Sequence, residues 1–301
     1  MKSKRLSLNS MDDQQYLQRT INEKVNSYVP EQAWDSTVAL VIMHENAVHQ
    51  FGSGILFSIA DDSFVVTAGH VVKQAQQYGK TLGISSATGF FVAVSGEWIC
   101  SSEGQYGTDK DPFDIAIHRL SQDEVAKIGH KTFLRFDDID FDSQSQTAVY
   151  TLFGFPCIWS KPSSSESDEL KLKPLQYTAF AYDRMTEALE EYQERFHILL
   201  SAQQRDCSNL DGSPAQFQDL NGNDAPFPEK LSGISGCSVW RIGDLNVPIK
   251  NWDQEQSRIV AVQTGVYNSA QVIKATRWVA VSTLLHVAFP ELRPAMQLWR
   301  M

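Results

Sequence analysis

Short runs of β-branched and aromatic residues, separated by turn residues, dominate the pattern of this chain. The runs cover 37–43, 53–59, 63–67, 89–95, 113–119, 147–153, 175–183, 197–203, 237–242, 258–266 and 271–281. Gly, Ser and Asp punctuate them, and few helical segments intervene. Many short strands with turn signals between them are typical of an antiparallel sandwich or barrel, and not of alternating strands and helices. The pattern therefore predicts an all-β fold.

Helical spacing of apolar residues is confined to three segments. Residues 12–28 predict a short amphipathic helix, and 184–196 reads as a second one. The end of the chain, 282–299, predicts helical turns that are broken by prolines and capped by Ser282 or Thr283. We expect the two terminal helices to lie against a β-rich body.

Charge and composition exclude several classes of partner. The chain has 301 residues, of which 42% are apolar and 21% charged, and its formal charge is −10 without a compensating Lys/Arg cluster. Such a chain is repelled by phosphate backbones and by anionic membranes. No apolar run approaches the ~18 to 20 residues of a membrane span, and no signal-peptide pattern opens the chain. We expect a cytoplasmic protein that binds neither nucleic acid nor membrane.

The four cysteines, Cys100, Cys157, Cys207 and Cys237, lie far apart and form no C-x-x-C pair. Neither zinc-ligand spacing nor a dense disulfide framework is present. We expect reduced, mostly buried thiols, and neither a metal nor a cofactor.

Three short motifs carry candidate chemistry. His70 ends T-A-G-H directly after an apolar strand, and Asp114 opens the apolar strand D-I-A-I. Ser235 lies in G-I-S-G, just before the strand that begins near Cys237. Each motif alone has a structural explanation: a satisfied core histidine, a turn aspartate, or a serine in a tight turn.

Taken in order, the motifs resemble those of the trypsin-like serine peptidases, the chymotrypsin fold, in a non-digestive, bacterial-type branch. That family carries histidine, aspartate and serine in this order along the chain. Residues 67–70, 114–117 and 233–236 are similar to its T-A-x-H, D-[IL]-A-[IL] and G-x-S-G signatures, and 154–156 (G-F-P) resembles a turn of its second barrel. The resemblance covers about 35–285.

The resemblance implies a fold and a domain plan. It implies two antiparallel six-stranded β-barrels, with a short N-terminal helix and a C-terminal helix. The first barrel is expected at about 35–135 and the second at about 145–285, the latter with an inserted segment, 157–230. Residues 1–34 would be a helical extension and 286–301 a helical tail.

The resemblance also implies catalytic roles. Ser235 would be the nucleophile, His70 its general base, and Asp114 the carboxylate that orients the imidazole. The backbone N–H groups of Gly233 and Ser235 would form the oxyanion hole. The protein would then be a serine endopeptidase that acts on a protein or peptide substrate.

One departure from the digestive trypsins bears on regulation. They carry an aspartate just before the serine, which pairs with a new N-terminus after zymogen cleavage, whereas this chain has Ile234. The site is therefore expected to be organised without N-terminal trimming. The long segment 206–230, rich in Asp, Asn, Gly and Pro, becomes the place where a regulatory partner or activator would act. A peptidase in this setting would cleave designated partners or await a trigger.

The sequence says less about substrate preference than about the catalytic residues. Six residues before the serine, Glu229 would floor the specificity pocket and favour Arg or Lys, although a solvated Glu229 beside Lys230 is the stronger interpretation. The backbone of Gln263, Thr264 and Gly265 is expected to pair with an extended substrate.

Three alternatives remain open at this stage. The chain can be a catalytically silent peptide-binding or scaffold module that retains the barrels. It can be another serine acyl hydrolase, such as an esterase, although the order of the motifs disfavours this. A thiol peptidase that uses Cys237 is the remotest, since that residue is expected to face inward on its strand.

Overall fold

The computed structural model describes most of the body of the chain. The described residues are 20–21, 23–25, 31–103, 111–141, 145–162, 169–182, 189–202, 217–218, 224–225 and 232–297. Residues 20–21 and 23–25 are helical, which agrees with the described part of the predicted N-terminal helix. Most of segment 206–230, with Glu229, and Cys207 lie outside the described residues.

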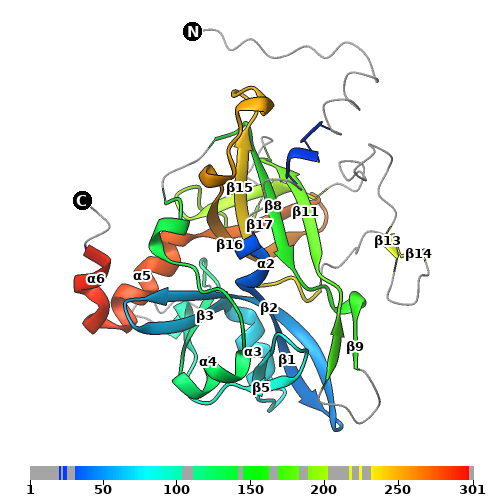
Figure 1. The fold of residues 1–301 in the computed structure, drawn as a ribbon, viewed down its shortest axis with the longest axis vertical. Helices are drawn as coiled ribbons and strands as arrows, with labels where there is room; N and C mark the ends of the chain where they lie inside the picture. Colours follow the sequence, from blue (N-terminus) through cyan, green and yellow to red (C-terminus); the bar gives the residue numbers. More distant parts are fainter. Residues whose placement is uncertain are drawn as a thin grey trace.

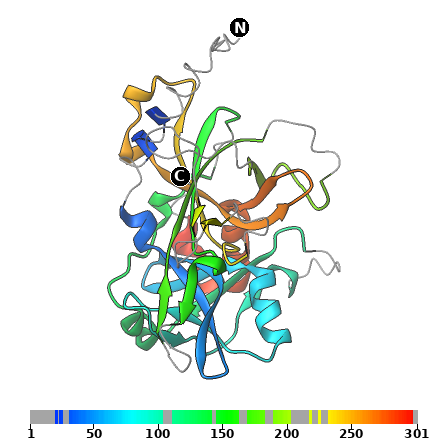
Figure 2. The same cartoon turned by 90° about the vertical axis from the view of Figure 1, so that its right-hand side faces the viewer.

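A seven-stranded antiparallel sheet forms the lower half of the molecule in Figures 1 and 2, in the order β5-β4-β1-β2-β3-β7-β6. Its strands are β1 (Thr37–His44), β2 (Ala47–Ile59), β3 (Asp62–Ala68), β4 (Leu82–Ser85), β5 (Phe91–Ala93), β6 (Ile99–Cys100) and β7 (Ile115–Leu120). The long strand β2 pairs with both β1 and β3, and a bulge at Phe51 interrupts its pairing with β1.

A six-stranded antiparallel sheet forms the upper half, in the order β11-β8-β15-β16-β17-β12. Its strands are β8 (Ala148–Gly154), β11 (Leu175–Phe180), β12 (His197–Ser201), β15 (Ser238–Asp244), β16 (Arg258–Tyr267) and β17 (Val272–Arg277). A bridge between Ala181 and Leu200 brings its first and last strands together. This is the predicted trypsin-like two-barrel fold, except that the first sheet has seven strands instead of six.

Two small hairpins and several helices complete the described elements. The hairpins pair β9 (Ser160–Pro162) with β10 (Leu170–Leu172), and β13 (Phe217–Gln218) with β14 (Asp224–Ala225). The α-helices are α2 (Glu31–Asp35), α3 (Gly69–Gln77), α4 (Gln122–Ile128), α5 (Trp278–Ala288) and α6 (Arg293–Gln297). The 3-10 helices are η1 (Ser101–Glu103), η2 (Phe136–Asp138), η3 (Cys157–Trp159), η5 (Ile249–Asn251), η6 (Gln254–Gln256) and η7 (Pro290–Leu292). No helix in the described part is both long and apolar enough to cross a bilayer.

Two sequence predictions of local structure were wrong. The strand expected over 271–281 ends at Arg277, and the helix that follows begins at Trp278, not at Ser282 or Thr283. Valines within this helix favour a strand locally, but burial of Trp278 and Val281 overrides that propensity. Of the helix expected over 184–196, the described residues 189–196 form turns.

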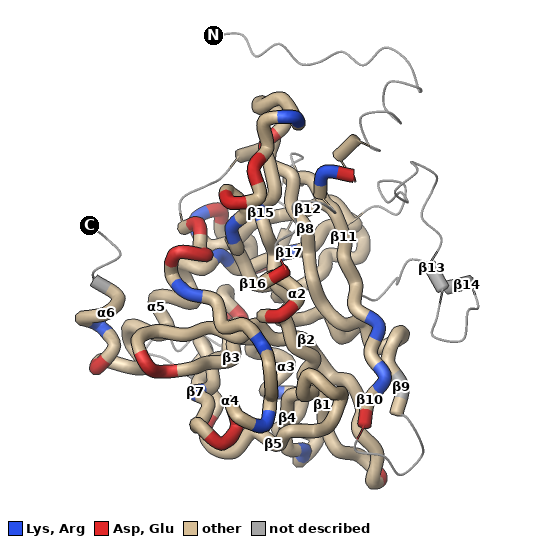
Figure 3. The backbone as a smooth tube through the Cα atoms, in the orientation of Figure 1, with Lys and Arg blue, Asp and Glu red and all other residues tan. Residues whose placement is uncertain are grey.

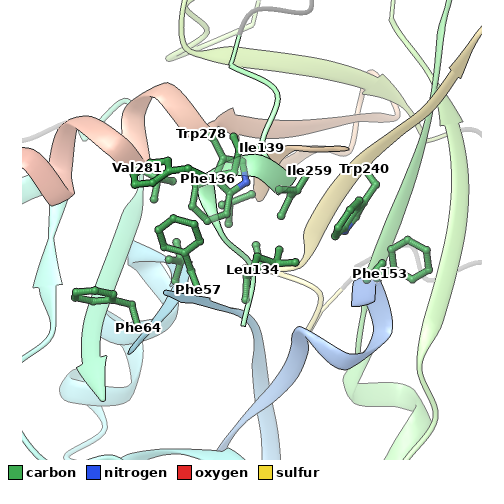
Figure 4. Packing of buried hydrophobic residues seen from close by; sticks show 14 of the residues in the cluster. Phe57, Phe64, Leu134, Phe136, Ile139, Phe153, Trp240, Ile259, Trp278 and Val281 are labelled. Carbon is green, nitrogen blue, oxygen red and sulfur yellow. The ribbon is translucent and has the colours of Figure 1, made fainter. Parts of the chain in front are cut away.

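The largest core cluster lies between the two sheets, as Figure 4 shows. It combines Phe57 of β2, Trp240 of β15 and Trp278 of α5 with Leu134 and Phe136 of the segment that links the barrels. The ring of Phe57 lies 5.3 Å from that of Phe136 and 5.0 Å from that of Trp278. The two barrels therefore share one buried interface.

Candidate active site

His70 stands at the start of α3, where the strand β3 turns into the helix. The first N–H groups of a helix lack partners within the helix, and Ala68 at the N-cap has no side-chain oxygen to offer. Asp114 replaces that cap from 44 positions away: its backbone oxygen accepts from Gly69 N (2.7 Å), and its Oδ1 accepts from His70 N (2.7 Å). Asp114 thereby fixes the backbone that carries the imidazole.

The same carboxylate also holds the imidazole ring. Asp114 Oδ2 lies 2.6 Å from His70 Nδ1, so the ring donates its Nδ1 proton and its Nε2 is left to accept. The Asp114 side chain is 17% exposed and that of His70 is 35% exposed, so the ring is partly open to solvent. Asp114 has a φ of 50°, a left-handed conformation that is uncommon for a residue other than glycine. An over-determined, strained aspartate is typical of a functional site.

The loop that carries Asp114 is held from the first barrel by two polar side chains. Ser101 donates to Asp111 Oδ2 (2.6 Å), and the same hydroxyl accepts from Ile115 N (3.0 Å). Asp111 Oδ1 accepts from Phe113 N (3.1 Å). These bonds set the conformation of the chain on both sides of Asp114.

The second barrel holds the same loop from the opposite side. Thr276 donates to the Phe113 oxygen (2.7 Å), and His197 Nε2 lies 2.7 Å from the Pro112 oxygen. His197 Nδ1 accepts from Gln193 N (2.9 Å), so Nε2 carries the proton and the ring is neutral. Burial, together with the nearby Lys274 charge, lowers the pKa of His197 to about 4.

Ser235 occupies a tight turn just before β15. Cys237 N donates to the Ile234 oxygen (2.8 Å), and Gly236 has a φ of 89°, as the third position of such a turn requires. Ser53 N donates to the Ser235 oxygen (2.8 Å), which ties the turn to β2 of the first barrel.

Gly236 allows this turn to approach the chain that leads to His70. A Cβ on Gly236 would overlap Ser53 O and Thr67 Oγ1 and would lie 3.1 Å from Ala68 N. The structure therefore brings the Ser235 turn against the chain two residues before the imidazole. Within the described part of the chain, no hydrogen bond joins Ser235 Oγ to the His70 ring.

Gly233 is the second position where only glycine fits. Its φ is 92°, and a Cβ there would lie 2.6 Å from both the N and the Sγ of Cys157. Among the described residues, neither Gly233 N nor Ser235 N donates a hydrogen bond within the protein. The turn thus presents two unused backbone donors beside the serine.

The predicted substrate-binding residues are only partly placed. Gln263 is 1% exposed, and its N and O bond with Cys237 O (2.9 Å) and Gly236 N (2.8 Å), so these groups support the serine turn. Thr264 is also buried, with its hydroxyl 3.0 Å from that of Thr276. Gly265 is partly exposed beside Lys274. Of the three, Gly265 alone keeps the exposure that substrate pairing needs.

Cys237 is unsuited to nucleophilic chemistry. It is 1% exposed and belongs to the interior cluster of the second barrel, as its inward-facing strand position predicts. Burial raises the pKa of its thiol far above the ordinary range, which disfavours the reactive thiolate. Among the described residues, no group of three His, Cys, Asp or Glu side chains is arranged to hold a metal ion.

The sequence reading missed four polar residues that surround this site: Gln50, Ser53, His197 and Thr276. All four lie in β-strands and are at most 7% exposed. A polar residue inside an otherwise apolar strand is the only local signal, and it does not say what the residue contacts. The hydrogen bonds by which they reach the Ser235 turn or the loop of Asp114 join groups at least 85 positions apart in the chain.

Comparison with known proteins gives remote structural likenesses only. No protein-family model matches the sequence, and no curated protein matches it either. Similar solved structures include the serine protease AL20 from an extremophilic microorganism, at 12% identity and a TM-score of 0.46, covering 85% of this chain and 97% of that one. The serine protease domain of the Sesbania mosaic virus polyprotein is 17% identical with a TM-score of 0.42, covering 82% and 91%. A Glu endopeptidase is 13% identical with a TM-score of 0.43, covering 87% and 93%. Likeness at this level assigns neither an activity nor a substrate to the chain.

Proposed function

We propose that this protein is a serine endopeptidase in which Ser235, His70 and Asp114 act together. One observation carries the proposal: Asp114 binds both the backbone and the ring of His70, at 2.7 Å and 2.6 Å, while the Ser235 turn packs on the strand that leads to that histidine. A purely structural contact does not require an imidazole that stays partly exposed, and the His70 side chain is 35% exposed.

The chemistry follows from the proton positions. His70 Nε2 would take the Ser235 proton as the hydroxyl attacks the substrate carbonyl, and Asp114 would stabilise the imidazolium that forms. The proton then passes to the leaving amine, which leaves an acyl group on Ser235. Water, activated by the same imidazole, hydrolyses this ester and restores the serine.

The unused amides of Gly233 and Ser235 would bind the oxyanion of each tetrahedral intermediate. Removing one such donor typically costs about 2.7–4 kcal/mol of transition-state stabilisation. A side chain at position 233 would collide with Cys157, so the free donor at that position depends on glycine.

A fluorophosphonate probe tests the proposal directly, since it labels a serine only where a base and an oxyanion site activate it. We expect the wild-type protein to be labelled and the Ser235→Ala variant to remain unlabelled. Cys237→Ser is the matched control, because it keeps the triad and removes the buried thiol two residues away; it should still be labelled. Mass spectrometry should place the adduct on Ser235.

Two results would overturn the assignment. Absence of labelling in folded wild-type protein favours the alternative, a silent peptide-binding module on the same fold. Labelling that survives Ser235→Ala places the nucleophile elsewhere.

We further propose that cleavage is restricted to particular protein substrates, and rapid, indiscriminate digestion of unstructured casein by the same preparation would contradict that restriction.

A further inference from the structure

The turn that bears Ser235 needs a support other than charge. The position just before the serine is Ile234, which is 1% exposed and packs in the interior of the second barrel. An apolar side chain anchors the turn but does not orient its peptide groups. Their orientation matters, since a single rotated peptide would turn the Gly233 N–H away from the site.

Gln50 of β2 meets this turn from the first barrel. The bulge at Phe51 changes the direction of the strand at this point. The Gln50 side chain beside it is buried, with 7% exposure. Its Nε2 lies within hydrogen-bonding distance of the oxygens of Gly233 (3.0 Å), Gly52 (2.8 Å) and Phe155, so the two protons of this amide are shared among three acceptors. Three carbonyl oxygens thus converge on one neutral amide donor.

Ser53 adds a second contact to the same carbonyl. Its hydroxyl donates to the Gly233 oxygen (2.8 Å) and accepts from Phe155 N (3.0 Å). The preceding carbonyl is held as well, because Cys157 N donates to the Ser232 oxygen (2.9 Å). Two successive carbonyls of the turn are therefore bound before any substrate arrives.

The bond from Cys157 N sets the direction of the free donor, and the bonds from Gln50 and Ser53 hold the next peptide group, which joins Gly233 to Ile234. In a trans peptide the C=O and the N–H of one unit point in opposite directions. With the Ser232 oxygen directed to Cys157 N, the Gly233 N–H points away from Cys157. Rotating this peptide would break the Cys157 bond and strain the neighbouring carbonyl that Gln50 and Ser53 hold.

We propose that Gln50, supported by Ser53, is the positioning residue of the oxyanion hole. It acts as an uncharged clamp from the first barrel and holds the Gly233 carbonyl so that the hole stands open. The inference rests on the proposed peptidase function and adds to it how the hole is kept in shape. A neutral amide achieves this without the desolvation cost of a buried ion.

Gln50→Met tests the clamp, because methionine has a similar length and no donor. We expect kcat to fall by about ten- to a hundredfold, part of the loss that follows removal of an oxyanion donor, while KM changes less than about threefold. A peptide aldehyde needs the oxyanion hole to bind tightly. Its affinity for the variant should therefore fall by the same factor as kcat. Ser53→Ala should have a smaller effect in the same direction, and the double variant a larger one than either.

The control is Glu124→Gln. Glu124 is 4% exposed and accepts from Ser95 and Ser121, so the change disturbs buried hydrogen bonds of the first barrel without touching the turn. It should leave kcat per folded molecule unchanged. If Gln50→Met also keeps full kcat, or loses activity only in proportion to unfolded protein, the clamp is wrong.

A second measurement separates failure of the clamp from failure of the proposed function. Gly236 N and Cys237 N are hydrogen-bonded within the turn region, so their hydrogen exchange reports its opening. Gln50→Met should accelerate exchange at these two amides about tenfold or more, whereas Glu124→Gln should not. This holds even if wild-type protein shows no Ser235-dependent activity, and unchanged exchange would overturn the clamp.

Discussion

Asp114 has two tasks that a single carboxylate can perform only in one orientation. One oxygen closes the N-terminus of α3 by accepting from His70 N, and the other binds the ring of the same residue. A negative charge near a helix N-terminus is also favourable. The backbone and the tautomer of the histidine are therefore determined together.

Asp114→Asn should separate these tasks. The His70 N–H requires an oxygen at the Oδ1 position, so the new amide NH2 takes the Oδ2 position and faces Nδ1. Nδ1 must then accept, the ring proton moves to Nε2, and the base is lost. We expect kcat to fall about 10⁴-fold while the melting temperature changes little, as measured with a peptide substrate and by calorimetry. A residual rate above a few per cent would show that the carboxylate does not set the tautomer.

The loop before β7 is the element on which the site depends most. Residues of the first barrel, Ser101 and Asp111, set its shape, whereas His197 of β12 and Thr276 of β17 hold it from the second barrel. The Asp114 carboxylate is thus positioned by both barrels, and movement of either would displace it.

His197 makes this element sensitive to acid. Its pKa is about 4 in the folded protein, against an ordinary value of 6.5, because it is buried near Lys274. The unfolded chain therefore binds a proton that the folded chain does not, and stability is lost as pH falls from about 6.5 to about 4. The full loss is roughly 3 kcal/mol.

His197→Gln should reduce this loss, since the substituted side chain does not titrate. The measurement is the free energy of unfolding in urea at several pH values between 4 and 7 for both proteins. The wild-type curve should fall more steeply with acid than that of the variant. Parallel curves would show that His197 is not the group responsible.

The arrangement of charge and core explains how the molecule holds two barrels as one body. Figure 3 shows charged residues of both signs along the chain, while long stretches of the central strands carry neither. The shared cluster joins both sheets to α5, and the C-terminal segment returns to the first barrel, where Phe289 meets Phe64 at 5.1 Å. The sheets should therefore unfold together.

Phe57→Ala tests this cooperation. Phe57 is fully buried at the centre of the shared cluster, so truncation should cost about 3–5 kcal/mol. Hydrogen exchange should show equal loss of protection in β1–β3 and in β15–β17. If protection falls in the first sheet alone, the barrels are independently stable and the shared core does not couple them.

Much of the fold follows from patterns within a few residues of each other. Alternation and turn residues located β1, β3, β7 and β8 within a residue or two, and the order of the three motifs predicted the barrels. The start of α5 was mistaken because its valines favour a strand, and only packing of Trp278 between the sheets overrides them. Two strands of the first sheet were also missed, since β4 has only four residues and β6 only two.

The sequence alone determined which residues are candidates: a histidine after a strand, an aspartate before one, and a serine between glycines. Only the tertiary structure decided which distant groups bind one another. Asp114 caps the helix of His70, and Gln50 and Ser53 hold the Gly233 carbonyl. The physical reason is range. Strand and turn preferences arise from neighbours in the chain, whereas these hydrogen bonds join groups 44 to 183 positions apart, and they exist only after two barrels have packed.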